Sequence, residues 1–256
     1  MKMKISNSIQ TDFEHYKDYV QNREHLFERE EFLQVSDIYH ELYIFSESIS
    51  KYDGMDDKSR INYFITECKN ALIISFDLLN MNYLNSSKQI LRSSIESFFR
   101  FSLSLMRYIE YKENCSKGYY GATESLKKLN TLYSSHKVFN LTNGTIEYFK
   151  ETIVNDCINN LYMNYSKLSS NVHITDTKEF SPQKYLLEYA KLNIADSIEA
   201  CELYNVVLNN YILVLIYFDK LLEVPSLTKK RIQFLEYQLD EKEKGILTEL
   251  ENFLKM

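Results

Sequence analysis

Two short stretches of this sequence carry side chains whose types and spacing could do chemistry. The first is ILRSSIESFFRF, residues 90–101, in which Arg92, Glu96 and Arg100 follow one another at intervals of four. Residues four apart share a helix face, and Arg92 and Glu96 lie at the edge of an apolar stripe or inside it. Charged groups are costly there unless they are paired, which points to a functional cluster. The alternative is an ordinary intrahelical ion pair, worth about 0.2–0.5 kcal/mol if exposed.

The second stretch is YSKLSSNVHI, residues 165–174. Tyr165, Ser169 and His173 advance by only ~40° per step of four, so all three can line one groove beside a helix. His173 falls at the C-terminal end of that helix, where the backbone dipole favours a protonated imidazole ring. A histidine that is partly protonated near neutral pH suits proton transfer. The alternative is that His173 only caps the helix by bonding a terminal carbonyl group.

The elements that must position these stretches are helices. The 256 residues include only 5 glycines and 2 prolines, too few for a chain rich in turns and strands. Apolar residues recur at intervals of three and four, and no stretch alternates with a period of two for long enough to propose a strand. The sequence therefore predicts an all-α fold, a multi-helix bundle.

We expect a single domain over residues 1–256, with its core bundle at about 57–223. Flanking helices at about 7–51 and 226–255 would pack on that core or on a partner. NLTNGT, residues 140–145, is typical of a turn, and Pro225 ends the last core helix. The predicted helices cover about 7–28, 30–51, 57–80, 84–112, 122–135, 146–172 and 183–223, followed by two short helices at the end.

The composition argues against several classes of site. The net charge is −6, whereas proteins that coat duplex DNA by bulk attraction are usually basic. The four cysteines, at 68, 115, 157 and 201, are too far apart in sequence for a zinc knuckle or a redox pair. No histidine pairing suggests a metal site. We therefore expect no metal, no cofactor and reduced thiols in a cytoplasmic protein.

A membrane partner is not expected either. The most apolar run, Val206 to Phe218, is shorter than the ~18 apolar residues of a membrane span, and Asn209 and Asn210 interrupt it. A buried helix explains this run better, and membrane association stays the weaker alternative. The opening MKMKISNSIQ has no apolar segment of the kind that a signal peptide needs.

Taken together, LRSSIESFFRF and YSKLSSNVH resemble a group of bacterial all-helical proteins of unknown function, commonly placed near the HEPN superfamily. The resemblance covers about residues 80–220. It implies a bundle with a four- to five-helix core, often present as a homodimer. Many HEPN domains are metal-independent ribonucleases in toxin–antitoxin and phage-defence systems. Others are non-catalytic modules that bind nucleotides or RNA.

In catalytic HEPN proteins an arginine precedes a histidine by four to six residues, and two protomers bring these motifs together. His173 matches the histidine, and Asn171 is a polar residue inside the motif. The arginine is not matched. Lys167 keeps its charge but lacks the planar fork that holds a phosphate with two hydrogen bonds.

The resemblance implies a role for each of these side chains. His173 would act as general acid or base on RNA, Arg92 or Lys167 would stabilise charge on the phosphorus centre, and Glu96 would orient the arginine. The residues expected to bind the substrate are Tyr165, Ser169, Asn171 and Arg100. The alternative is a module that binds RNA, a nucleotide or a protein, in which the same polar cluster only fixes the register of the helices.

Overall fold

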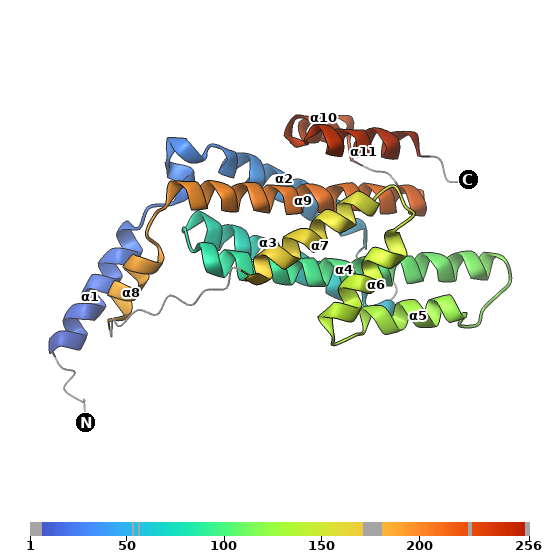
Figure 1. Ribbon diagram of the computed structural model, residues 1–256, viewed down its shortest axis with the longest axis horizontal. Coiled ribbons are helices and arrows are strands. Elements are labelled where there is room, and N and C mark those ends of the chain that lie inside the picture. Colours follow the sequence, from blue (N-terminus) through green and yellow to red (C-terminus); the bar gives the residue numbers. More distant parts are fainter. Residues whose placement is uncertain (1–6, 53, 56, 171–180, 225–226, 254–256) are drawn as a thin grey trace, which may run out of the picture.

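The computed structural model describes residues 7–52, 54–55, 57–170, 181–224 and 227–253. Within this described part every regular element is a helix: eleven α-helices and four short 3-10 helices. The predicted all-α multi-helix bundle is therefore confirmed. Figure 1 shows the long helices running side by side, while α1 (Asn7–Asn22) and α8 (Pro182–Tyr189) form a pair that projects at one end.

Two long helices organise the bundle, α4 (Leu84–Ser116) and α9 (Ile194–Leu222). They meet where the rings of Phe98 and Tyr211 stack with their centroids 4.1 Å apart. Around them lie α2 (Gln34–Ser48), α3 (Ile61–Asn80), α5 (Glu124–Tyr133), α6 (Val138–Phe149), α7 (Asn155–Ser170), α10 (Lys229–Gln238) and α11 (Glu241–Asn252). The 3-10 helices are Leu26–Glu28, Glu30–Phe32, Ser50–Tyr52 and Asp57–Ser59.

The predicted helix at 146–172 is wrong in its boundaries. Helix α6 already begins at Val138 and runs through residues 140–145, the predicted turn. Gly144 is helical, and a Cβ atom there would collide with the side chain of Leu132 in α5. The glycine therefore allows two helices to approach closely instead of breaking one. The actual break lies at residues 150–154, between α6 and α7.

The predicted helix at 183–223 is also two helices, because α8 ends at Tyr189 and α9 begins at Ile194. Asn193 caps α9, since its side-chain oxygen accepts hydrogen bonds from the backbone nitrogens of Ala195 and Asp196. The Asn82 amide donates to the Ala190 carbonyl at 2.9 Å and fastens the connecting turn to the start of α4. Apolar periodicity continues across this break and does not reveal it.

The hydrophobic core reaches beyond the predicted segment 57–223 on both sides. Val35, Ile38 and Phe45 of α2 are each at most 2% exposed, although α2 was expected to flank the core. Near the other end of the chain, Leu247 and Leu250 of α11 are buried in the same cluster. These two helices are parts of the core, because they cover α9.

Helix α9 contains the apolar run Val206–Phe218 of the sequence. Within the described residues it is the one helix long and apolar enough to cross a membrane by length and composition. However, 78% of its most apolar window is buried inside the bundle, and core helices share this length and composition. Its place at the centre of the bundle confirms the expectation of a buried helix.

A group of buried polar side chains lies where α2, α9 and α11 meet. Glu41 is completely buried beside the amide of Asn205, whose nitrogen, when directed at the carboxyl group, lies 2.5 and 3.2 Å from its two oxygens. Burial, together with the charge of Glu243, raises the pKa of Glu41 to about 9. Burial also raises the pKa of Glu243 to about 7. Glu41 is therefore protonated and uncharged at neutral pH.

We expect the fold to lose stability as the pH rises. The native state keeps the Glu41 proton up to a pKa of about 9, whereas the unfolded chain releases it near the ordinary value of 4.5. The native state thus binds more protons between these pH values, and the free energy of unfolding falls across that range. Glu41→Gln should flatten this fall and raise the melting temperature at pH 8, as measured by circular dichroism.

The matched control for this prediction is Glu249→Gln, which changes an exposed carboxylate on α11. It should follow the wild-type pH dependence, because an exposed carboxylate pays little desolvation in the folded state. An unchanged slope in Glu41→Gln would show that this carboxyl group is not the source of the pH dependence.

Candidate functional site

The two stretches expected to carry chemistry meet where α4 and α7 are in contact. On α4, Nη2 of Arg92 pairs with Oε1 of Glu96 at 3.4 Å. From α7, the Tyr165 hydroxyl accepts a hydrogen bond from Nη2 of Arg92 and donates one to Oε1 of Glu96 at 3.1 Å. The three side chains form a closed triangle, here named the Arg92 cluster (Arg92, Glu96 and Tyr165).

The Arg92 cluster is held firmly yet reaches solvent. The side chains of Arg92 and Glu96 are 35% and 25% exposed, and Tyr165 is almost buried. The Arg92 guanidinium carbon lies 4.7 Å from the centre of the Tyr165 ring, in range of a cation–π contact. Burial raises the pKa of the Tyr165 phenol, although the hydrogen bond from Arg92 opposes the rise. The phenol therefore stays protonated and donates a hydrogen bond to Glu96.

Arg92 keeps unused hydrogen-bonding capacity. Its Nε atom is buried, and no acceptor bonds to it within the described part of the chain. A buried donor without an acceptor costs about 1–3 kcal/mol. Guanidinium groups bind phosphate oxygens through two parallel N–H donors. Nη2 anchors the side chain and Nε is enclosed by protein, so an anion would meet the remaining terminal nitrogen, Nη1, on the exposed part of the side chain.

Ser169 lies one turn beyond Tyr165 on α7, as expected from the spacing of four. Its side chain is exposed, and its hydroxyl donates to the backbone carbonyl of Tyr165 at 2.8 Å. The structure therefore places it next to the Arg92 cluster, with its hydroxyl turned to its own helix.

Lys167 does not join the Arg92 cluster. It lies two residues after Tyr165, about 200° around the helix axis, and so it faces a different neighbour. Its side chain lines a groove of about 520 Å³ between α7 and α9, together with Glu199 and Glu202. Helix α7 thus turns Lys167 toward α9, away from Glu96, and its catalytic part stays a prediction.

Arg100 is also placed differently from the expectation. Its guanidinium donates to the backbone carbonyls of Tyr133 and Ser135, at 2.5 and 2.8 Å. Both carbonyls belong to the end of α5 and the turn that follows, where no next helical turn supplies donors. Arg100 therefore fastens α5 to α4, away from the hydrogen bonds of the Arg92 cluster, and its part in binding a substrate stays a prediction. Asn171 and His173 lie outside the described residues, so their part in the site stays a prediction.

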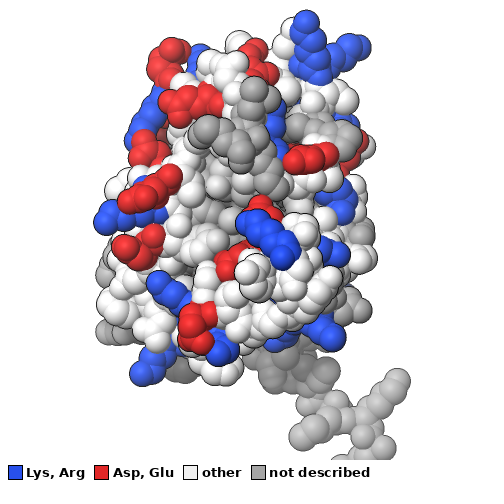
Figure 2. Space-filling view, turned by 90° about the vertical axis from the view of Figure 1, so that its right-hand side faces the viewer, with Lys and Arg blue, Asp and Glu red and all other residues white. Residues whose placement is uncertain are grey.

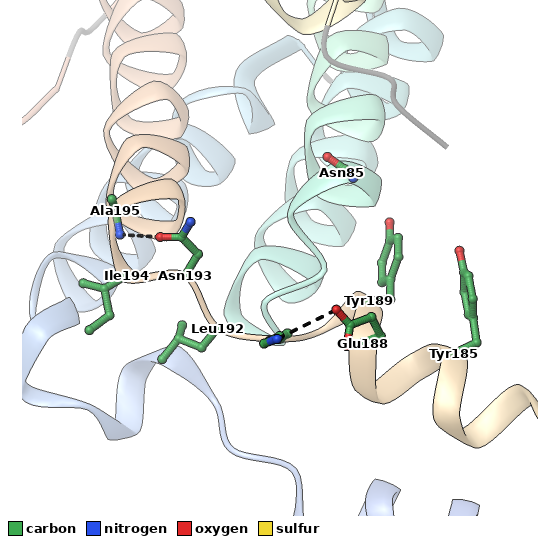
Figure 3. A pocket seen from close by; sticks show the side chains of 9 residues that line it. Asn85, Tyr185, Glu188, Tyr189, Leu192, Asn193, Ile194 and Ala195 are labelled. Carbon is green, nitrogen blue, oxygen red and sulfur yellow. Dashed lines mark hydrogen bonds and ion pairs between the residues drawn. The ribbon is translucent and has the colours of Figure 1, made fainter. Parts of the chain in front are cut away.

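A second candidate site, which the sequence analysis missed, lies at the junction of α8 and α9. It is a cavity of about 660 Å³ between Tyr185 and Tyr189 of α8, Asn85 of α4 and the segment 191–195. We name it the tyrosine pocket. Figure 3 shows the two tyrosine rings side by side on α8, with Asn85 above them and Leu192 and Ile194 at the far side. The spacing of four between the tyrosines was a signal for a shared helix face, but the break that opens the cavity was not visible.

The described residues offer little else with metal or thiol chemistry. They contain no group of three or more His, Cys, Asp or Glu side chains that could hold a metal ion. Cys68, Cys157 and Cys201 are buried, and burial raises the pKa of each thiol. The face of the molecule in Figure 2 shows acidic and basic side chains interspersed, not gathered by sign.

Removing the Arg100 guanidinium should weaken the fold. Arg100→Ala leaves two carbonyls at the end of α5 without their donor, so we expect a loss of about 2 kcal/mol in the free energy of unfolding. Urea denaturation followed by circular dichroism measures this loss. Lys167→Ala, at an exposed position of α7, should stay within about 0.5 kcal/mol of wild type. Equal losses in the two variants would contradict the structural role of Arg100.

No model of a protein family matches this chain, and neither a curated protein nor a solved structure matches it. The contacts of its own side chains are therefore the basis for a proposed function.

Proposed function

We propose that this chain is a HEPN-like protein that binds RNA at the Arg92 cluster and cleaves it without a metal ion. The observation that carries the proposal is the contact between the two stretches on which the resemblance rests. Arg92 and Glu96 come from one stretch and Tyr165 from the other, and they share one set of hydrogen bonds. A contact between helices brings together side chains 73 residues apart in sequence.

Arg92 is the group that would hold a phosphate. Its position is fixed on one side by Glu96 and Tyr165, and its side chain is still about one-third exposed. A positioned guanidinium loses little conformational freedom when it binds, so more of its interaction energy goes into affinity. Glu96 lowers the net charge of the cluster, which favours a single phosphate over a long run of phosphates as the bound group.

Cleavage would depend on His173. In RNA the 2′-hydroxyl oxygen bonds to the adjacent phosphorus while the bond from phosphorus to the 5′-oxygen breaks. A histidine either takes the proton of the attacking hydroxyl or gives one to the leaving oxygen. Arg92 would stabilise the negative charge that grows on the phosphorane oxygens. Ser169, one turn from Tyr165, would position the strand beside it.

Other parts of the proposal follow from the resemblance. A homodimer would bring two such sites together, and the protein would act in the cytoplasm, in a prokaryotic toxin or phage-defence system. RNA or a protein would be its partner.

A second candidate function is a non-catalytic interaction module. The contacts that favour it are the same hydrogen bonds: Glu96 and Tyr165 already satisfy Nη2 of Arg92, and Lys167 faces the other side of α7. In that case the Arg92 cluster serves as a clamp that fixes the register of α4 and α7. Polar networks between packed helices can specify one packing arrangement.

Cleavage of total RNA by the purified protein in EDTA tests the ribonuclease. We expect the wild type to cleave, and His173→Ala to cleave at least about 100-fold more slowly, because proton transfer contributes about that much. Arg92→Lys should also cleave RNA more slowly than the wild type, since lysine lacks the planar guanidinium group that fits a phosphate. His136→Ala, at an exposed histidine, is the matched control. No cleavage by the wild type, or equal cleavage by His173→Ala, refutes the ribonuclease.

Tyr165→Phe separates the clamp from the binding site. It removes the hydroxyl between Arg92 and Glu96 and keeps the ring, so we expect a loss of about 1 kcal/mol in stability under both functions. If Arg92 holds a phosphate, the affinity of Tyr165→Phe for RNA should fall as well, because the lost hydroxyl no longer orients the Arg92 guanidinium. An unchanged affinity for a 2′-O-methyl RNA, which the proposed reaction cannot cleave, measured by fluorescence anisotropy at constant salt, would favour the module. A melting temperature several degrees lower in His173→Ala would favour it too.

A further inference from the structure

The walls of the tyrosine pocket are fixed by contacts outside the pocket. The Tyr189 hydroxyl bonds to Oγ of Ser86 at 2.6 Å and accepts a hydrogen bond from its backbone nitrogen at 3.1 Å. The edge of the Tyr83 ring packs against Tyr189, with centroids 5.6 Å apart. Asn82 bonds the Ala190 carbonyl and so holds the turn at the base of the pocket. The cavity is therefore formed before any ligand arrives, which is typical of binding sites.

The chemistry of the pocket suits a flat aromatic group. Tyr185 and Tyr189 lie nearly parallel, with ring centroids 5.7 Å apart and an angle of 23° between the planes. Both side chains are half-buried and line the cavity, so each contributes apolar ring surface to it (Figure 3). Asn85 and Glu188 supply hydrogen-bonding groups for the edge of a bound ring. Lys191, 74% exposed and 3.9 Å from Glu188, supplies a positive charge at the rim.

The pocket and the Arg92 cluster lie along one face of α4. Asn85 lines the pocket, and Arg92 follows it by seven residues, which is almost two full turns. The two positions therefore differ by only about 20° around the axis and by about 10.5 Å along it. Gln89, exposed between them, continues the same polar face. A strand with one group in the pocket could follow this face and place a phosphate at Arg92.

From these contacts we infer that the tyrosine pocket binds a nucleobase of single-stranded RNA, whose backbone runs along α4 to Arg92. The inference rests on the proposed RNA-binding function and adds to it the subsite that grips the base. Aromatic side chains bind bases of any sequence because every base has a π-face. The pocket therefore contributes affinity for unpaired bases, with little preference among sequences. A free mononucleotide offers the same ring and phosphate chemistry, and the experiment separates the two sources.

The test measures binding by fluorescence anisotropy with the full chain, at constant salt and in EDTA. The probes are a labelled ten-nucleotide single-stranded adenine RNA with 2′-O-methyl groups, which the proposed reaction cannot cleave, the same strand without its bases, and AMP as a competitor. Variants are Tyr185→Ala, Tyr185→Phe and the control Tyr237→Ala, which removes an 83% exposed tyrosine on α10. Melting temperatures show whether each variant folds.

We expect the wild type to bind the RNA with bases about tenfold or more tightly than the strand without bases. Tyr185→Ala should lose that difference, whereas Tyr185→Phe and Tyr237→Ala should keep it. If Tyr185→Ala unfolds α8, Tyr185→Leu, which keeps the apolar volume and removes the π-face, gives the same comparison. Competition by AMP at low concentration would identify a free nucleotide as the ligand of the pocket.

The outcomes separate the pocket from the proposed function. Wild-type binding of RNA with no dependence on bases, or a base dependence that survives in Tyr185→Ala, overturns the pocket and leaves RNA binding intact. Binding of AMP that depends on Tyr185, without binding of RNA, supports the pocket and refutes the proposed function. Binding of neither probe refutes both.

Discussion

Every residue of α9 from Val207 to Asp219 is buried. Most of these side chains are apolar, and they point to all sides of the helix. A helix that is apolar all round needs neighbours all round. Helix α4 covers it on one side, α2 and α7 on others, and α11 closes the remaining face. The fold is therefore arranged around one helix. The positions of α2, α4, α7 and α11, which include the two helices that carry the Arg92 cluster, follow from covering it.

Polar groups inside this buried helix determine which neighbours fit. Asp219 is almost completely buried, pairs with Lys51 and accepts a hydrogen bond from the Tyr52 hydroxyl at 3.2 Å. Asn210 lies nine residues before Asp219 in the same helix, and its side-chain amide donates to Glu243 of α11 at 3.4 Å. A buried charge without a partner costs several kcal/mol, so these pairs disfavour any other docking of the segments near the two ends of the chain.

Much of this arrangement could be predicted from the sequence, and the limits have a physical cause. The helical class, and the shared faces of Arg92 with Glu96 and of Tyr165 with Ser169, follow from 3.6-residue periodicity. Which neighbour covers a face does not follow from it. Arg100 binds backbone carbonyls, which have no sequence signature, and Lys167 faces α9 only because α7 packs with Tyr165 toward α4. The tyrosine pocket exists because Asn193 starts a new helix within an unbroken apolar pattern.

The contact between Gly144 of α6 and Leu132 of α5 has a consequence for how this sequence can diverge. A methyl group at position 144 would occupy the space of the Leu132 side chain. Alanine at 144 can thus be accepted only when residue 132 turns away or becomes smaller. Among descendants of this chain, the two positions should change together: glycine opposite leucine, or a larger residue opposite valine or alanine. The residue types at positions 132 and 144 therefore reflect how closely α5 and α6 approach.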